Sequence, residues 1–225
     1  MDTDTRHTVM ATNTPDTTRI DGVIFGLPMA VLALAMVLYC VPQLSPVWKY
    51  AQAEAEYMHV ARGDIPGELE LDALTGALRR SGKPSDLSRA AHAQLIRAQQ
   101  LGVRSIRALP RLTAARRDLL KGVSAAPADA YAWTRLAVVE MHISNKASAA
   151  RALEMALQLA PAERKLTAIQ FDLAVVLWPE LEPAARSSIA QRLRWARQLP
   201  ELKAAVSGNS AKTLERLLAE TPSPR

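Results

Sequence analysis

Few residues in this sequence have the types and spacing that catalysis or metal binding requires. Four histidines are spread along the chain: His7, His59, His92 and His142. They form neither the H-x-x-x-H nor the H-E-x-x-H spacing that places two imidazoles on one face of a helix. The glycines are dispersed, with no phosphate-binding loop and no G-x-S-x-G elbow. We therefore expect a protein that is not an enzyme and that holds no cofactor and no metal.

Two further features could indicate a reactive site, but each has a simpler interpretation. Glu54 and Glu56 lie two residues apart, so on a helix their carboxylates diverge and are solvated. His92, between alanines in RAAHAQL, is a candidate for a pH-sensitive contact, although a histidine that merely lies on a helix face is the commoner case.

The composition favours helices. Ala, Leu and Arg are abundant and aromatic residues make up only 4% of the chain, a mixture that loses little side-chain freedom in a helix. The formal net charge is +6. The one cysteine, Cys40, excludes a disulfide within the chain and a multi-cysteine metal site.

An uncharged segment near the amino terminus predicts a membrane anchor. Residues 22–48 contain no charged side chain, and the apolar part, residues 23–41, is close to the roughly 20 residues that cross a bilayer. We predict a disordered tail at residues 1–21 and a transmembrane helix at residues 22–44. A cleaved signal peptide and a buried core helix remain as alternatives.

The side of the membrane is harder to predict. Arg6 and Arg19 before the segment are matched by Lys49 and Arg62 after it, so the positive-inside rule gives no answer. We expect a single-pass protein of the inner membrane whose soluble domain lies in the periplasm.

After residue 45 the apolar periodicity is helical throughout. Expected helices cover about residues 46–61, 68–80, 86–101, 110–123, 165–177, 183–197 and 211–220, with two more inside residues 130–161. Membrane-proximal helices at residues 45–86 then precede a repeat domain at residues 87–221. The fold class predicted is all-α: one transmembrane helix followed by a short solenoid of helical hairpins.

Charge is unevenly placed along these helices. Residues 50–72 hold six acidic residues, and residues 73–121 hold eleven Lys or Arg against Asp86 and Asp118. This basic stretch predicts contact with an anionic glycan or lipid, or else a solvated face whose cations pair with the acidic residues before it. The candidate basic patch is Arg79, Arg80, Arg111, Arg116 and Arg117. The stretch lacks aromatic residues, so no nucleic-acid partner is expected.

A repeat is visible in the middle of the chain. The tripeptide APA occurs at residues 126–128 and again at residues 160–162, so Pro127 and Pro161 lie 34 residues apart. Between them lie a large–large–small set and a small–large–small set, as two helices in close contact require. These repeat-packing residues are Trp133, Leu136, Ala137, Ala149, Leu153, Ala156 and the closing Pro161.

On these residues the chain resembles the tetratricopeptide-repeat family over about residues 91–200. Ala115, Leu119, Gly122 and Pro127 repeat the code of the second helix, and residues 171–178 echo residues 134–141 at an offset of 37. Glu140 departs from the pattern, because the family has a tyrosine there. An unrelated helical bundle with coincidental spacing is the alternative.

The resemblance implies that first helices line a concave binding face. The implied partner-binding residues are Tyr131, Thr134, Val138, Met141 and His142, which can instead pack against the next repeat. Thr134 and Val138 do not fit the family's carboxylate clamp. We expect a membrane-anchored scaffold or adaptor for protein–protein interaction in a bacterial cell-envelope assembly, either exopolysaccharide or capsule export or protein translocation. The alternative is a module that binds an anionic glycan or lipid through residues 73–121.

Overall fold

The computed structural model describes residues 34, 36, 52–60, 62, 64 and 67–220. Within these residues every regular element is a helix and no strand occurs. Contacts divide the chain into two compact units, residues 1–48 and residues 49–225. The predicted tail and anchor lie outside the described residues, except for Leu34 and Met36.

The predicted fold class needs a correction. It included a transmembrane helix, whereas no helix among the described residues is long and apolar enough to cross a membrane. The longest with stated bounds, α3 and α4, have 17 residues each and carry charged side chains, and a span needs about 20 apolar residues. The class that the structure supports is all-α.

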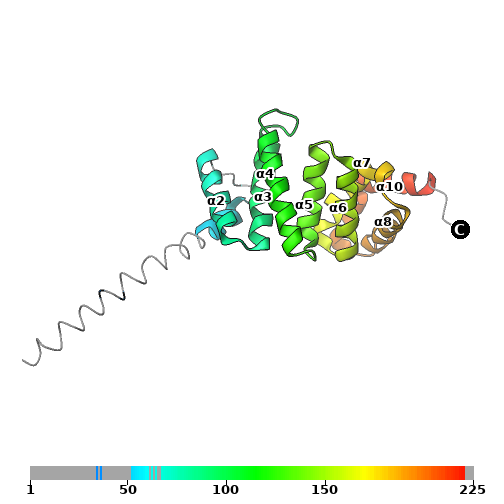
Figure 1. Cartoon of the computed structure of the whole chain (residues 1–225). Helices are drawn as coiled ribbons and strands as arrows, with labels where there is room; N and C mark the ends of the chain where they lie inside the picture. The colour runs from blue at the N-terminus through cyan, green and yellow to red at the C-terminus, as the bar shows by residue number, and fades with distance from the viewer. Residues whose placement is uncertain are drawn as a thin grey trace, which may run out of the picture. The chain divides into compact units, whose positions relative to one another are not determined.

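The helices of the second unit follow one another in a row (Figure 1). Their bounds are α2 Glu68–Ser81, α3 Pro84–Gln100, α4 Leu109–Ala125, α5 Ala130–His142, α6 Lys146–Leu159, α7 Thr167–Leu177, α8 Pro183–Ala196, α9 Lys203–Ser207 and α10 Asn209–Glu220. Short 3-10 turns are η1 Arg164–Leu166, η2 Trp178–Glu180 and η3 Pro200–Leu202. Residues 52–60 are also helical.

Local sequence explains where several of these helices begin and end. Asp129 accepts a hydrogen bond from the Ala132 amide at the start of α5, and Asn145 accepts one from the Ser148 amide at the start of α6, so each satisfies a free backbone donor. Gly82 follows α2 in the left-handed region, with φ 69°, as a glycine at this position allows.

Neighbouring helices form antiparallel hairpins. α3 packs along α4, and α5 packs along α6 after a three-residue turn. The first helices of successive hairpins also touch, α3 with α5 and α5 with α7, while α6 touches α8. The last hairpin is different, because α7 packs more closely on α10 than on α8. The chain therefore brings α3 and α7 into contact with α5, although α5 starts 46 residues after α3 and α7 starts 37 residues after α5.

The core lies between these helices and is rich in alanine. Ala137, Ala149, Leu153 and Ala156 are fully buried, and Leu136 is buried beside them. Trp133 is partly buried against the same core, and its Nε1 donates to the Pro127 carbonyl at 2.8 Å. Pro161 is exposed in the turn after α6. The small side chains let the helices approach closely, while the leucines fill the space beside them.

Candidate functional site

A pocket of about 340 Å³ lies among the first helices. We call it the first-helix pocket. Its lining residues come from α3, α5 and the η1–α7 segment: His92, Leu95, Ile96, Gln99, Tyr131, Thr134, Arg135, Val138, Lys165, Leu166, Ala168 and Ile169. It is therefore built from three segments that the hairpin stack brings together.

Three of the five predicted partner-binding residues lie here. Tyr131, Thr134 and Val138 line the pocket from α5. Thr134 is buried, donates to the Ala130 carbonyl at 2.9 Å and accepts from Gln170 Nε2 at 3.2 Å. Its hydroxyl is thus used within the fold, and Tyr131, which is half-buried, is the member of this set with the most accessible surface.

The other two predicted residues do not line the pocket. Met141 is partly buried and packs against the main core. His142 is half-buried, and burial lowers the pKa of its imidazole. For these residues the structure is consistent with the packing alternative, since both follow the last turn of α5 that reaches the pocket.

A chain of hydrogen bonds sets the polar side of the pocket. Arg135 donates to Ser88 Oγ at 2.6 Å and to the Tyr57 hydroxyl at 3.5 Å, and that hydroxyl lies 3.0 Å from His92 Nδ1. Burial, and then the charge of Arg135, lowers the pKa of His92 to about 4. The imidazole is therefore neutral at pH 7, and the Tyr57 hydroxyl, which accepts from Arg135, is able to donate to its Nδ1.

The lining of the pocket carries two cationic side chains. Arg135 and Lys165 line it, and no acidic residue is among its lining residues within the described chain. The Glu163 carboxylate hydrogen-bonds Tyr131, and the pKa of Tyr131 is raised first by burial and then by this contact. Leu95, Ile96 and Ile169 are apolar members of the same lining.

The predicted basic patch does not form one free surface. Arg79 pairs with Asp118 at 2.6 Å and Arg116 with Glu140 at 2.7 Å. Arg111 pairs with both Glu68, at 2.8 Å, and Asp72. Arg80 and Arg117 are exposed. Pairing of basic residues with the preceding acidic block, which was the simpler sequence interpretation, is what the structure shows for Arg111.

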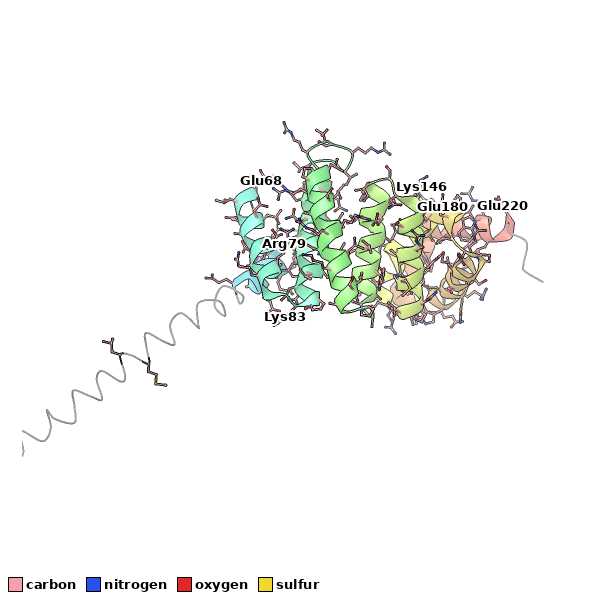
Figure 2. The ribbon with its side chains drawn as sticks, in the orientation of Figure 1. Glu68, Arg79, Lys83, Lys146, Glu180 and Glu220 are labelled. Carbon is pink, nitrogen blue, oxygen red and sulfur yellow. The ribbon has the colours of Figure 1, made fainter. Side chains whose placement is uncertain are left out.

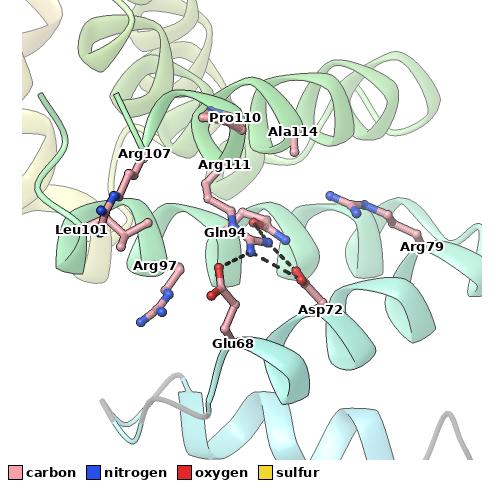
Figure 3. Close-up of a pocket in the computed structure, with 10 residues that line it drawn as sticks. All are labelled: Glu68, Asp72, Arg79, Gln94, Arg97, Leu101, Arg107, Pro110, Arg111 and Ala114. Atoms are coloured by element: carbon pink, nitrogen blue, oxygen red, sulfur yellow. Dashed lines mark hydrogen bonds and ion pairs between the residues drawn. The ribbon is translucent and has the colours of Figure 1, made fainter. Parts of the chain in front are cut away.

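A second pocket, of about 560 Å³, surrounds Arg111 (Figure 3). We call it the arginine pocket. Its lining residues come from α2, α3, α4 and the α3–α4 loop: Glu68, Asp72, Arg79, Gln94, Arg97, Leu101, Arg107, Pro110, Arg111 and Ala114. In Figure 3 the dashed lines join Arg111 to Glu68, Asp72 and Gln94, whereas none reaches Arg97 or Arg107.

Nothing in the described chain forms a metal centre. Among the described residues, no three His, Cys, Asp or Glu side chains form a group that could hold an ion. Comparison with protein-family models, with curated proteins and with solved structures finds no match. The likeness to tetratricopeptide repeats therefore stays a prediction that rests on residues and spacing.

Sequence reasoning missed most of the first-helix pocket. The residues from α3 were not predicted to bind, and Arg135 was left out of the set on α5. One signal was present: adding the 34-residue offset of Pro127 and Pro161 to Tyr131, Thr134 and Arg135 gives Lys165, Ala168 and Ile169, which all line the pocket. The α3 residues had no such signal, because the preceding repeat matches only in its second helix.

Proposed function

We propose that this protein is a helical-repeat scaffold that binds a segment of a partner polypeptide in the first-helix pocket. The observation that carries the proposal is the convergence of Tyr131, Arg135 and Lys165 with apolar residues of α3 and α7 on one pocket. Pockets that combine an apolar wall with a few fixed polar groups are the usual form of a binding site.

The chemistry of the pocket favours a segment with an apolar side chain next to an acidic group. Ile96 and Ile169 offer apolar surface, whose burial contributes roughly 25 cal/mol per Å². Arg135 is held in place by Ser88 and Tyr57, which are both neutral partners, so its charge is available for a carboxylate. A charge-assisted hydrogen bond of this kind is about twice as strong as a neutral one.

The resemblance to tetratricopeptide repeats supports the same role, because that family binds peptides on its first helices. It also fits a protein without catalysis, as proposed from the histidine and glycine spacing. The cell-envelope settings, exopolysaccharide or capsule export and protein translocation, remain predictions. Co-purification of an export or translocation complex with the full-length chain from its native cells would test them.

The pocket itself is tested by site-specific photo-crosslinking. A benzophenone amino acid replaces Tyr131 or Ile169 in the full-length protein, with Gln158, exposed on α6, as the control position. We expect both pocket positions, and not position 158, to crosslink to the same partner segment, with an apolar residue near an acidic one.

A charge variant makes the test specific. Arg135→Gln should reduce that crosslink at least about tenfold, since it removes a charge-assisted contact of about 1.5–3 kcal/mol. Arg151→Gln, at an exposed position of α6, should leave it unchanged. Equal crosslinking from position 158, or full crosslinking in Arg135→Gln, would refute the proposed site.

A further inference from the structure

The loop between α3 and α4, residues 101–108, stands out past the ends of the neighbouring helices (Figure 1). Two turns give it a defined shape: the Ser105 amide donates to the Gly102 carbonyl at 2.7 Å, and the Ala108 amide donates to the Ser105 carbonyl at 3.0 Å. Gly102 has φ 78°, a left-handed conformation that glycine adopts without strain. The α3–α4 loop therefore presents its side chains from a folded base.

Apolar side chains at this loop are unusually exposed. Ile106 is 85% exposed and Leu109, the first residue of α4, is 51% exposed. Single exposed apolar residues are common on proteins. Here, however, the isoleucine lies between Arg104 and Arg107, which are also exposed. Cations on both sides of an exposed isoleucine form a surface with both charged and apolar parts.

Two arginines of the α3–α4 loop carry charge that no ion pair cancels within the described residues. Residues 87–117 contain seven arginines and no acidic residue. Arg104 and Arg107 take part in no ion pair among the described residues. The basic patch predicted from the sequence, in contrast, has three of its members in ion pairs, as described above.

The arginine pocket lies at the base of the loop and extends this charge inward. Arg97 and Arg107 both line it. Arg97 binds Gln100 at 3.1 Å through Nη1, while its buried Nε has no hydrogen-bond partner in the described chain. Glu68 and Asp72 also line the pocket, but both are held by Arg111. Arg97 and Arg107 thus remain for an anionic group.

From this geometry we infer that the α3–α4 loop docks on a membrane surface that contains anionic phospholipid. Ile106 and Leu109 enter the boundary between headgroups and acyl chains, while Arg104, Arg107 and Arg97 bind headgroup phosphates, with the arginine pocket receiving one headgroup. An anionic polymer in water would require only the cations. Only a membrane places phosphate beside an apolar phase, which accounts for the exposed isoleucine as well.

This contact is peripheral and is independent of the proposed peptide site. The first-helix pocket uses His92, Ile96 and Gln99 of α3, whereas the arginine pocket uses Gln94, Arg97 and Leu101. No residue lines both pockets. A failure of one proposal therefore leaves the other standing.

The test places an environment-sensitive fluorophore in the loop of the full-length protein. The probe is attached at Ile106→Cys in a Cys40→Ser background, because Cys40 is the one native thiol. The control probe is attached at Ser124→Cys, near the other end of α4, which is a distance of roughly 25 Å along the helix. The vesicles are phosphatidylcholine alone, or phosphatidylcholine and phosphatidylglycerol in equal parts.

We expect the probe at position 106 to shift to shorter wavelength with the anionic vesicles only, and the probe at position 124 not to shift. Because the probe reports its own surroundings, other attachments of the chain to the vesicle do not produce this pattern. Raising the salt concentration should reverse the shift, since screening weakens headgroup attraction. Inorganic phosphate alone should produce no shift.

Variants distinguish the contribution of the arginines in the α3–α4 loop from that of the general positive charge of the protein. Arg104→Gln with Arg107→Gln should weaken binding to anionic vesicles about thirtyfold, because each surface cation contributes about fivefold. Arg80→Gln with Arg117→Gln removes the same charge from exposed positions on α2 and α4 and should have a much smaller effect. Arg80 lies at the Lys83 end of α2, and Figure 2 places Lys83 toward the end of the helices opposite Glu68.

Ile106→Ser, in the unlabelled protein, should weaken vesicle binding about tenfold without changing the salt dependence. Three results would overturn the inference: an equal shift with phosphatidylcholine alone, a shift that survives in the Arg104→Gln, Arg107→Gln protein, or a shift caused by inorganic phosphate without vesicles. The last of these would assign the site to a soluble anion instead.

Discussion

At the scale of single residues, Glu140 shows how a departure from a repeat pattern is accommodated. Its side chain is buried on α5, where it accepts from Arg116 Nε of α4 at 2.7 Å and from Asn145 Nδ2 at 3.1 Å. A buried carboxylate is costly without partners. Arg116 and Asn145 supply them, and the ion pair thereby connects the second helix of one hairpin to the first helix of the next.

Replacing Arg116 should therefore destabilise the protein, because the buried Glu140 carboxylate loses a partner. We expect Arg116→Met to lower the free energy of unfolding by about 1–2 kcal/mol, since Glu140 keeps only Asn145 as a partner and Arg116 is partly exposed. Urea unfolding monitored by circular dichroism measures the change. Arg117→Met, at the exposed neighbouring position, is the control and should change the free energy by less than about 0.5 kcal/mol.

His92 gives a prediction about pH. Its pKa is about 4 in the folded protein, against the usual 6.5 of histidine, chiefly because of burial and then because of Arg135. The unfolded chain therefore takes up a proton first, so the stability contributed by neutral His92 is full above about pH 7. This contribution is lost as the pH falls from 6.5 toward 4.

Between about pH 7 and about pH 5, we expect His92 to account for a loss of roughly 2 kcal/mol in the free energy of unfolding. His92→Gln should remove that part of the pH dependence, whereas His59→Gln, at an exposed position, should retain it. Parallel urea titrations at the two pH values provide the measurement. An unchanged pH dependence in His92→Gln would show that other groups cause it.

At the scale of elements, Arg192 of α8 connects the end of one hairpin to the start of the next. It is 3% exposed and donates to the Ala160 carbonyl at 2.7 Å, to the Glu163 carbonyl and to Thr167 Oγ1 at 3.1 Å. Burial lowers its pKa to about 10, which still leaves it charged at neutral pH. One guanidinium thus donates hydrogen bonds to three acceptors in and beside the turn between α6 and α7.

Replacing this side chain should loosen that turn. We expect Arg192→Met to lower the free energy of unfolding by about 3 kcal/mol, because three acceptors lose a charged donor and the backbone carbonyls among them stay near the core. Arg194→Met, at an exposed position of the same helix, serves as the control. Hydrogen exchange should show faster exchange at residues 160–167 in Arg192→Met than in the control.

Helix positions could largely be predicted from the sequence, because caps, prolines and apolar spacing are local. The helix predicted at residues 68–80 is observed as Glu68–Ser81, and that at residues 183–197 as Pro183–Ala196. The five-residue α9 was missed, since it is too short to show a period. The pairing of Arg111 with Glu68 and Asp72 was also beyond local patterns, because it depends on how α4 packs against α2.

The candidate site follows the same division. Tyr131, Thr134 and Val138 could be predicted because their positions on one helix follow from its own period. Which residues of α3 and α7 face them depends on how the hairpins pack against one another in the shared core. That packing has no local marker except where a repeat is well preserved.

At the scale of the whole molecule, α3 is the wall that the two proposed sites share. One of its faces contributes to the first-helix pocket and another to the arginine pocket. A scaffold with this arrangement would hold a polypeptide partner near an anionic membrane surface. Confinement of that kind raises the effective concentration of a partner without new contacts.

Because α3 is packed on both sides and no residue lines both pockets, we expect the two binding events to be thermodynamically independent. Arg135→Gln should weaken binding of the polypeptide partner and leave the affinity for anionic vesicles within about twofold. Arg104→Gln with Arg107→Gln should weaken vesicle binding and leave the affinity for the partner within about twofold. Vesicle co-sedimentation with and without the partner segment measures both affinities. A partner that changes vesicle affinity by about fivefold or more would reveal coupling of at least roughly 1 kcal/mol, which would require α3 to move as binding proceeds.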